Sequence, residues 1–295
     1  MTAPWVRAVK SILPRPIYDP ASEWAVRLIT WRRLMGYVRG ATAGDAVWLW
    51  LSFLASPFTS LIGLSGWRDP LLLHDMVADV DGIGRFRLRA HTDDLWHVVP
   101  FRETAVLRCI QGLLRPGDVF VDAGANIGTY SVAGAKLVGP SGTVLAIEML
   151  EGTARVLRDH IELNDLHNVQ VVERALAARA DEHFTASMPA GSFGQASITN
   201  KREGETFEVV STTFDLLLKD IPSVRLLKID IEGAELDALK GASGILDRVE
   251  SIAFEHLDKQ SLEDIRALLV PRGFRIERLD GGNSLALRQT TTWDV

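Results

Sequence analysis

The stretch VFVDAGANIGTYS, residues 119–131, decides the fold of this 295-residue chain. An apolar strand runs here into a glycine-rich turn, and a helical pattern follows the turn. A second apolar strand, TVLAIE, follows at 143–148, then a helix near 152–164 and a third strand, NVQVVERAL, at 168–176. This alternation of strands and helices predicts a parallel sheet with right-handed crossovers.

The second half of the chain continues the same pattern. VRLLKID (224–230) and VESIAFEH (249–256) are predicted as the fourth and fifth strands, and FRIERLD with SLALRQ (274–289) as a closing antiparallel pair. Residues 177–211 lack clear periodicity and are polar, so we expect an insertion there. A short helix is expected at 212–220.

The glycine-rich turn predicts a nucleoside site. Gly124 lets the backbone turn tightly, and Gly128 lets a ligand or the strand approach closely. Glu148 follows 20 residues after Gly128, at a position where a carboxylate can accept hydrogen bonds from both hydroxyls of a ribose. The run is D-x-G-x-N-x-G, with Asn126 where a dinucleotide site expects glycine. Asp122 would repel a pyrophosphate but suits the ammonium group of S-adenosylmethionine, which favours that ligand over NAD.

These pieces carry a family resemblance. VFVDAGANIGTYS, the IE pair at 147–148, LNDLHNVQVVERAL at 163–176 and LLKIDIEGAELDALKGA at 226–242 resemble the FkbM family of S-adenosylmethionine-dependent methyltransferases. The similarity covers roughly residues 100–290. It implies an α/β, class I methyltransferase (Rossmann-like) fold with a seven-stranded sheet whose last strand is antiparallel. MLEG replaces the proline-containing turn that is common in the family after Glu148.

The resemblance also implies an activity, methyl transfer from S-adenosylmethionine to a hydroxyl of a sugar, glycan or secondary metabolite. The predicted cofactor contacts are Asp122, Gly124, Asn126, Gly128, Glu148 and Ala175. Two alternatives remain, a non-catalytic adenosyl-binding or scaffold module and a methyltransferase acting on a lipid-linked glycan at a membrane. A nicotinamide dehydrogenase is disfavoured by Asp122 and by the missing G-x-G-x-x-G.

Candidate acceptor-side residues converge at the carboxyl ends of the strands, where ligands bind in open α/β sheets. The predicted catalytic residues are Asp230, His256 and Glu232, and His256 is the best general base by its ordinary pKa. A second interpretation has Asp230, Glu255 and His256 bind Mg²⁺ or another divalent cation. Lys228, within an apolar strand, is expected to pair with a carboxylate.

Flanking segments supply further candidates for the acceptor side. The polar, glycine-rich run at 192–197 is expected to lie over the carboxyl edge of the sheet and contribute to acceptor specificity. His91, His97 and Arg102, from the segment before the first strand, are also candidates to face the acceptor.

The composition differs between two parts of the chain. The net charge is −6, yet residues 1–44 hold seven basic and two acidic side chains, a net +5, which leaves −11 for the rest. Seven of the eight tryptophans precede residue 100. We therefore expect a helical, basic, Trp-rich N-terminal extension at 1–75 and a methyltransferase domain at 76–295, with 76–115 as a lead-in hairpin and helix.

An uncharged run of 22 residues, AVWLWLSFLASPFTSLIGLSGW at 46–67, lies in this extension. Its length matches a bilayer core, but serines and Pro57 interrupt it. The favoured interpretation is two helices, near 21–38 and 45–56, that pack on the C-terminal domain. Peripheral membrane contact and a true span are the alternatives.

Composition also excludes several classes of protein. A single cysteine excludes an internal disulfide and a cysteine-built zinc site. The acidic balance argues against nucleic acid as a partner, and the apolar run begins too far from Met1 for a signal peptide. The expected location is cytoplasmic, with membrane association as the alternative. The sequence leaves an oligomer open.

Overall fold

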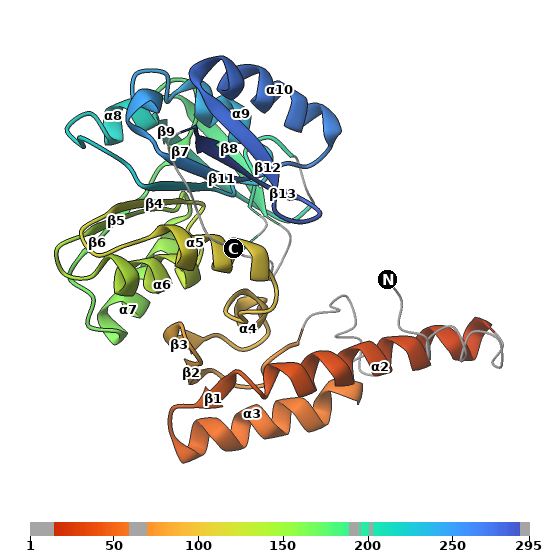
Figure 1. Ribbon diagram of the computed structural model, residues 1–295. Helices are drawn as coiled ribbons and strands as arrows, with labels where there is room; N and C mark the ends of the chain where they lie inside the picture. The colour runs from red at the N-terminus through yellow and green to blue at the C-terminus, as the bar shows by residue number, and fades with distance from the viewer. Residues whose placement is uncertain (1–14, 59–69, 189–193, 195, 201–202, 290–295) are drawn as a thin grey trace. The chain divides into compact units, whose positions relative to one another are not determined.

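The computed structural model describes residues 15–58, 70–188, 194, 196–200 and 203–289 (Figure 1). The chain divides into two compact units. One comprises Met1–Asp81 with Phe86–Val99, and the other comprises Gly82–Arg85 with Pro100–Val295. The strand Val38–Gly40 pairs with the strand Met76–Val80, which ties residues on both sides of residue 75 into one sheet. The methyltransferase domain at 76–295 stays a prediction.

Two helices and a small sheet build the first unit. In chain order its elements are α2 (Arg15–Leu34), β1 (Val38–Gly40), α3 (Ala43–Ala55), η1 (Ser56–Phe58), β2 (Met76–Val80), β3 (Gly84–Leu88, whose first residues belong to the second unit) and α4 (Asp94–His97). The sheet order is β1-β2-β3. The two predicted helices are therefore present as α2 and α3, and the predicted hairpin as the neighbouring strands β2 and β3.

A capping box starts α3. The Thr42 hydroxyl accepts the Asp45 N–H at 3.2 Å, and the Asp45 carboxylate accepts the Thr42 N–H at 3.1 Å. These bonds satisfy amides that lack partners in a first helical turn. No helix within the described ranges is long and apolar enough to cross a membrane. Residues 59–67 of the uncharged run lie outside those ranges.

A seven-stranded sheet forms the centre of the second unit. The helices and strands of the whole second unit are, in chain order, α5 (Thr104–Leu113), β4 (Val119–Ala123), α6 (Thr129–Val138), β5 (Thr143–Ile147), α7 (Glu151–Leu163), β6 (Val169–Val172), β7 (Ala175–Leu176), β8 (His183–Met188), β9 (Glu205–Thr212), α8 (Phe214–Leu217), β10 (Leu226–Ile229), α9 (Glu235–Lys240), η3 (Leu246–Arg248), β11 (Ser251–Glu255), α10 (Lys259–Leu269), η4 (Val270–Arg272), β12 (Phe274–Arg278) and β13 (Asn283–Arg288).

The order of the main sheet is β12-β13-β11-β10-β4-β5-β6. The pairs β11–β10, β10–β4, β4–β5 and β5–β6 are parallel, whereas β13 is antiparallel to both β11 and β12. This topology confirms the predicted class I methyltransferase fold, including the antiparallel last strand.

Helices cover both faces of the sheet (Figure 1). On one face Phe120 packs with α5 and α6 residues such as Ile110 and Ala135. On the other face Val121 packs in the cluster that includes Phe214 of α8 and Ile265 of α10. The alternating sides of one strand thus serve two cores, which is the behaviour of a strand buried on both faces.

The segment 177–211 is a hairpin, not an irregular polar insertion. Strands β8 and β9 pair antiparallel over six residue pairs, and β7 pairs parallel with β9. The predicted third strand is correspondingly split, since β6 ends at Val172 and Ala175–Leu176 joins the small sheet. The hairpin's inward side chains are Phe184, Ala186 and Met188 on β8 and Phe207 and Val209 on β9, so a short period-2 pattern is present within the polar segment.

Gly124 holds β4 close to β10. Its φ is +75°, and a Cβ built there would lie 1.8 Å from the carbonyl oxygen of Asp230. Gly128 is similar, with φ +92° and a built Cβ 2.3 Å from Leu157 Cδ1. Both positions therefore need glycine, as the sequence predicted, because a side chain would be strained and obstructed.

Replacing Gly124 by alanine should destabilise the second unit by about 3 kcal/mol, since left-handed strain and a backbone collision act together. Chemical denaturation measures the change. Gly152→Ala is the matched control, because a Cβ at Gly152 in α7 meets nothing within 4 Å. Equal stability of the two variants would contradict the collision argument.

Candidate active site

A cavity lies where β4, β5 and β10 end in the second unit. The predicted site residues that line it are Gly124, Asn126, Glu148, Ala175, Asp230 and Glu232. Four other predicted residues are not among its lining, namely Asp122, Gly128, Glu255 and His256. The carboxyl edge of a parallel sheet is the expected place for such a cavity.

Glu148 follows β5 directly and is 8% exposed. One carboxylate oxygen accepts the Asn126 N–H at 3.0 Å, and the other accepts the Leu150 N–H at 2.9 Å. Burial raises the pKa of Glu148 to about 7, although the two backbone bonds act in the opposite direction. The side chain therefore holds the β4–α6 turn in place while it faces the cavity.

Asn126 lies in that turn with a positive φ of 49°, a conformation that asparagine tolerates better than most residues. Its Oδ1 is buried and has no hydrogen-bond partner among the described residues. An unpaired buried acceptor at the wall of a cavity is available to a ligand's hydroxyl or amino group.

Asp122 occupies a different place from the one predicted. It lies on the Phe120 face of β4, toward α6, is fully buried, and accepts a hydrogen bond from Ser131 Oγ at 2.7 Å. Lys228 Nζ pairs with the same carboxylate at 3.1 Å. Side chains alternate along a strand, so the carboxylate points into the layer between sheet and helix, and the cavity does not include it.

Lys228 joins the ends of two strands. Besides Asp122, its Nζ lies 3.6 Å from Asp230 Oδ2 and donates to the Gly124 carbonyl at 3.1 Å. The Tyr130 ring is 5.2 Å away. Burial disfavours the charged form, but Asp122 and Asp230 raise the pKa of the Lys228 ammonium above its ordinary value. The expected carboxylate partner of Lys228 is thus confirmed.

Glu232 is held in a left-handed conformation with φ +54°. Its carbonyl accepts three hydrogen bonds from the segment before β9: Ser197 Oγ at 2.8 Å, Asn200 Nδ2 at 3.0 Å and Thr199 Oγ1 at 3.3 Å. A non-glycine residue keeps such a strained backbone conformation where several surrounding contacts hold it in place. The loop after β10 is therefore fixed to the hairpin segment.

The predicted acceptor segment 192–197 is partly described. Gly194 and Ala196 line the cavity, as does Ile198 just beyond. Residues 192, 193 and 195 lie outside the described residues. The described part of the segment thus lies at the cavity, and its role in acceptor specificity stays a prediction.

Carboxyl groups gather at the Asp230 end of the cavity. Glu235 Oε1 accepts the N–H groups of Ile231 and Gly233 at 3.0 and 3.1 Å. Burial, followed by the charges of Asp230, Glu232 and Glu235, raises the pKa of Glu255 to about 8. Glu255 thus keeps its proton near pH 7, and the Glu255 and Asp230 carboxyl groups hold one proton between them.

The predicted metal site is not formed. Within the described ranges no three His, Cys, Asp or Glu side chains are arranged to hold a metal ion. Glu255 and His256 are consecutive along an extended strand and point to opposite faces. The His256 ring accordingly lies 6.3 Å from Phe254, in the cluster on the other face, away from the Glu255–Asp230 pair.

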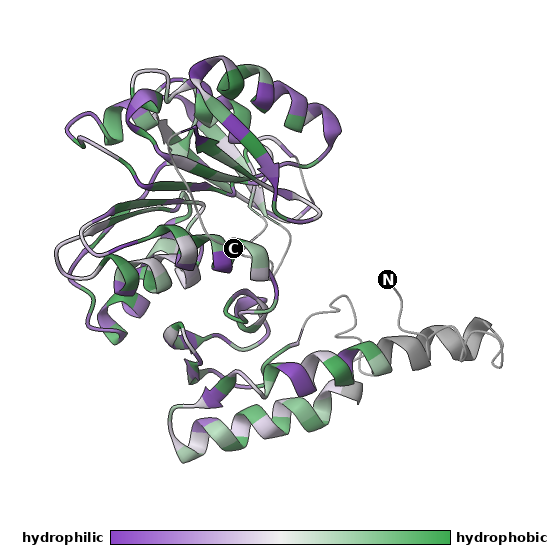
Figure 2. Cartoon of the chain, viewed as in Figure 1, coloured by the Kyte–Doolittle hydropathy of each residue, from purple (hydrophilic) through white to green (hydrophobic). Residues whose placement is uncertain are grey.

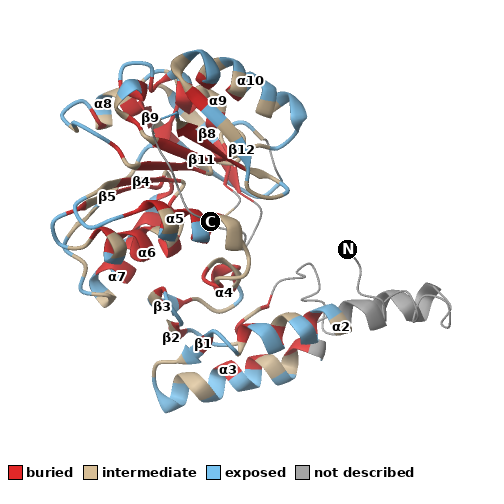
Figure 3. Ribbon diagram, viewed as in Figure 1, coloured by how far each residue is buried: buried red, intermediate tan, exposed pale blue. Residues whose placement is uncertain are grey.

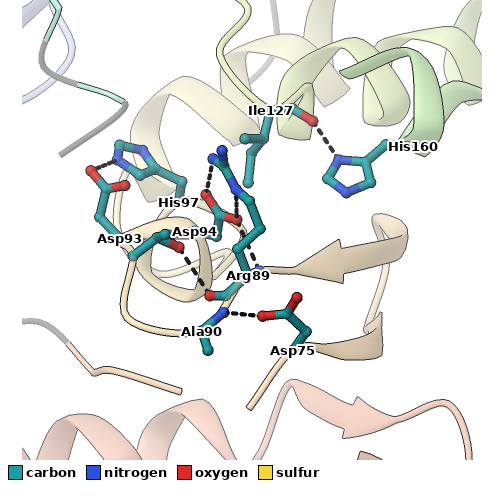
Figure 4. A network of polar contacts seen from close by, with 9 residues as sticks. Asp75, Arg89, Ala90, Asp93, Asp94, His97, Ile127 and His160 are labelled. Carbon is teal, nitrogen blue, oxygen red and sulfur yellow. Dashed lines mark hydrogen bonds and ion pairs between the residues drawn. The ribbon is translucent and has the colours of Figure 1, made fainter. Parts of the chain in front are cut away.

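Upstream polar residues form a network within the first unit (Figure 4). His97 Nε2 lies 3.1 Å from Asp93 Oδ2, and Arg89 makes two side-chain hydrogen bonds of 2.8 Å to Asp94. These contacts fold the β3–α4 connection on itself. The acceptor-facing role predicted for His97 stays a prediction.

Comparison with known proteins identifies the family. The model of the methyltransferase FkbM domain matches residues 122–276, more than half of the chain. This chain belongs to the FkbM methyltransferase family. It is therefore a methyltransferase, and S-adenosylmethionine is the methyl donor that its family implies.

Two similar proteins come from a fungus and an archaeon. Methyltransferase 1 of Beauveria bassiana is 30% identical over 200 residues, which cover 59% of this chain and 80% of that protein. Hexuronic acid methyltransferase AglP of Haloferax volcanii is 25% identical over 197 residues, 66% of this chain and 79% of that protein. The crystal structure of methyltransferase FkbM from Methylobacillus flagellatus aligns with a TM-score of 0.43 and 18% identity, over 66% of this chain and 54% of that chain.

Sequence reasoning missed several cavity residues. Met149 and Arg174 line the cavity but belong to no recognisable motif. Each follows the end of a strand, and that position was the one indication in the sequence that they could reach the site. The carbonyl clamp on Glu232 was also missed. Its signal was the run of Ser, Thr and Asn at 197–200, residue types whose side chains readily bond to backbone.

The raised pKa of Glu255 predicts a pH dependence of stability. Its folded value of about 8 lies above the ordinary value of 4.5, so the folded state keeps the proton longer and the unfolding free energy falls as pH rises through this window. After screening of a partly exposed group, we expect a loss of about 1–2 kcal/mol. Glu255→Gln should remove this part of the slope in urea denaturation between pH 5 and 8.

Glu277→Gln is the control, because Glu277 is exposed on β12. The control should follow the wild-type slope. An unchanged slope in Glu255→Gln would mean that the carboxyl pair does not share a proton in the folded state.

Proposed function

We propose that this methyltransferase transfers the methyl group of S-adenosylmethionine to a hydroxyl oxygen of a sugar, glycan or secondary metabolite. One observation carries the proposal: Glu148, suited to a ribose, lines the same cavity as Asp230 and Glu232, which are suited to a hydroxyl proton. A nucleoside-binding group and proton-accepting groups thus border one space, as transfer between two bound molecules requires.

The residues present fit the cofactor. Each oxygen of Glu148 accepts one backbone N–H, which leaves acceptor capacity on both oxygens for the two ribose hydroxyls. The unpaired Oδ1 of Asn126 offers a further acceptor nearby. The glycine turn keeps the cavity wall free of a side chain at residue 124. When bound, S-adenosylmethionine supplies a methyl group activated on a sulfonium centre.

Asp122 and Gly128 support this site without lining its cavity. Asp122 positions Lys228, which in turn contacts the Gly124 carbonyl. Gly128 allows the helix α6 to start close to Leu157 of α7. Both therefore act on the cofactor through the shape of the β4–α6 turn, whereas Ala175 lines the cavity wall directly.

Asp230 is our candidate for the proton acceptor. Its carboxylate lines the cavity, so the acceptor's hydroxyl proton would pass to the Asp230 carboxylate. Glu232, in the same wall, is the next candidate. His256 remains a third, because its buried Nε2 has no hydrogen-bond partner in the described part of the chain, although it lies on the opposite strand face from Asp230.

The charges around the cavity favour a hydroxyl over a carboxylate as the methylated group. Asp230 and Glu232 line the cavity and would repel an ionised carboxylate, whereas a neutral hydroxyl meets no such penalty. The similar protein named hexuronic acid methyltransferase supports a sugar acid as one acceptor to test, with its hydroxyls as the expected positions.

Binding of S-adenosylhomocysteine should raise the melting temperature of the protein. Glu148→Gln should weaken that binding about 10- to 100-fold, because charge-assisted hydrogen bonds to the ribose are lost. Calorimetric titration gives the affinity. Glu151→Gln changes an exposed neighbour whose carboxylate pairs with Arg155 at 3.0 Å, and this variant should bind as the wild type does. No binding by the wild type would refute the cofactor assignment.

Methyl transfer should give a product that is stable to alkali, since methyl ethers resist base and methyl esters hydrolyse. The assay offers labelled donor with a panel of neutral glycosides, uronic acids and their methyl esters. Asp230→Asn should reduce kcat about 100- to 10,000-fold while retaining affinity for S-adenosylhomocysteine. An alkali-labile product would point to a carboxylate acceptor, and cofactor binding without transfer would favour the scaffold alternative.

A further inference from the structure

Large apolar side chains are exposed mainly in the first unit. Among the described residues, ten of the thirteen exposed large hydrophobic residues lie between 26 and 58, on α2, α3 and the segments that adjoin them. Figure 2 shows α3 in the colours of hydrophobic residues along its length, and Figure 3 shows much of the same helix as exposed. A contiguous apolar surface of this kind marks an interaction site in a folded protein.

Helix α3 has an apolar face turned to solvent in addition to its buried side, which holds Leu49 and Ser52. Val47, Trp50, Leu51 and Leu54 are exposed and follow the i, i+3, i+4, i+7 spacing of one helix face. Ser52 lies on the buried side and is 1% exposed, with its hydroxyl bonded to backbone groups of Trp48 and Leu73 at 2.8 and 3.0 Å. The apolar face is therefore turned outward while a serine is turned in.

No charged residue interrupts this face. The sequence is uncharged from 46 to 67. Asp45, at the start of α3, uses its carboxylate to cap the helix through Thr42 and to accept the Val77 N–H at 3.1 Å. Residues of α3 beyond its first turn thus present only apolar and tryptophan side chains outward, which costs free energy in water.

Helix α2 adds positive charge beside the apolar face. The two helices are joined by Trp31, whose ring lies 5.9 Å from Phe53, and by Arg27, which donates to the Ser56 carbonyl at 3.1 Å. Arg32 and Arg33, in the last turn of α2, are exposed. Residues 1–44 carry a net +5. The pair of helices therefore combines apolar, tryptophan and arginine side chains.

We propose that the α2–α3 pair lies on an anionic lipid surface, with the outer face of α3 inserted at the level of the headgroups. Tryptophan and arginine are the residues that settle at this level of a bilayer, and positive charge adds attraction to anionic lipids. At 13 residues α3 is about 20 Å long, too short to span the hydrocarbon core. The contact is interfacial.

A second copy of the chain is a poorer occupant of the same face. In a twofold interface each surface meets itself, so Arg32 and Arg33 of one copy would approach the equivalent residues of the other. The one acidic residue of α3, Asp45, uses its carboxylate to cap the helix and to accept the Val77 N–H. Anionic headgroups supply that opposite charge, and for this reason the lipid surface is favoured.

Co-sedimentation of the full chain with vesicles tests the proposal. The protein should pellet with mixed phosphatidylcholine–phosphatidylglycerol vesicles and much less with phosphatidylcholine alone, and added salt should release it. The double variant Trp50→Glu/Leu54→Glu should bind at least about tenfold more weakly. Because both side chains are exposed, the variant should keep the wild-type unfolding midpoint.

Two further variants make the outcome decisive. Arg32→Glu/Arg33→Glu should lose the preference for phosphatidylglycerol without touching the apolar face, and Leu216→Glu, an exposed apolar residue of the second unit, should bind as the wild type does. The proposal is overturned if the wild type fails to sediment, or if Trp50→Glu/Leu54→Glu sediments unchanged. It is also overturned if the protein dimerises through these residues and does not bind vesicles, as light scattering would show.

Discussion

The catalytic end of the second unit depends on the buried ion pair between Lys228 and Asp122. The two residues are direct partners in the parallel register of β10 and β4, and both are almost inaccessible to solvent. Removing one partner would leave a buried, unpaired charge, which costs about 3–5 kcal/mol. A one-residue slip between the strands would turn Lys228 to the other face. The pair therefore stabilises one register, and the ends of β4 and β10 carry the cavity walls.

Several carboxyl groups coexist near Asp230 because each has a separate means of stabilisation. Lys228 offsets Asp230, backbone N–H groups stabilise Glu235, and a proton retained on Glu255 leaves a single negative charge on the Asp230–Glu255 pair. The remaining negative potential is what a cationic methyl donor would meet on binding. An acidic site of this kind binds a sulfonium compound better than a phosphate, which agrees with the D-x-G-x-N-x-G turn and with membership of a methyltransferase family.

The sequence predicted the part of the fold that local pattern encodes. Apolar strands, the glycines at 124 and 128 and the carboxylate after β5 were recoverable because each obeys a rule of spacing or backbone conformation. The sequence also encodes the face of β4 on which the Asp122 side chain lies, because side chains alternate along a strand and Val121 and Ala123 belong to the opposite face. The prediction relied instead on the position of Asp122 near the end of the strand. The strands of 177–211 carry only a short alternation of apolar residues, Phe184, Ala186 and Met188 in one strand and Phe207 and Val209 in the other, and the polar composition of the whole segment outweighed this pattern in the prediction.

The metal hypothesis failed for a related reason, as Glu255 and His256 were combined although neighbours in a strand point apart.

Residues 1–44 are basic and the rest of the chain is acidic, so a charged surface attracts these two parts to different degrees. Residues 1–44 carry a net +5, whereas the rest of the chain, most of α3 included, carries −11. An anionic lipid surface attracts the basic part, and the uncharged outer face of α3 adds apolar contact. A water-soluble acceptor gains nothing from such a contact. A glycan carried on a lipid would gain from it, because its lipid portion would share the surface that we propose for α3. The lipid-linked glycan is thus the alternative acceptor that would use both features of the chain, and it stays a prediction.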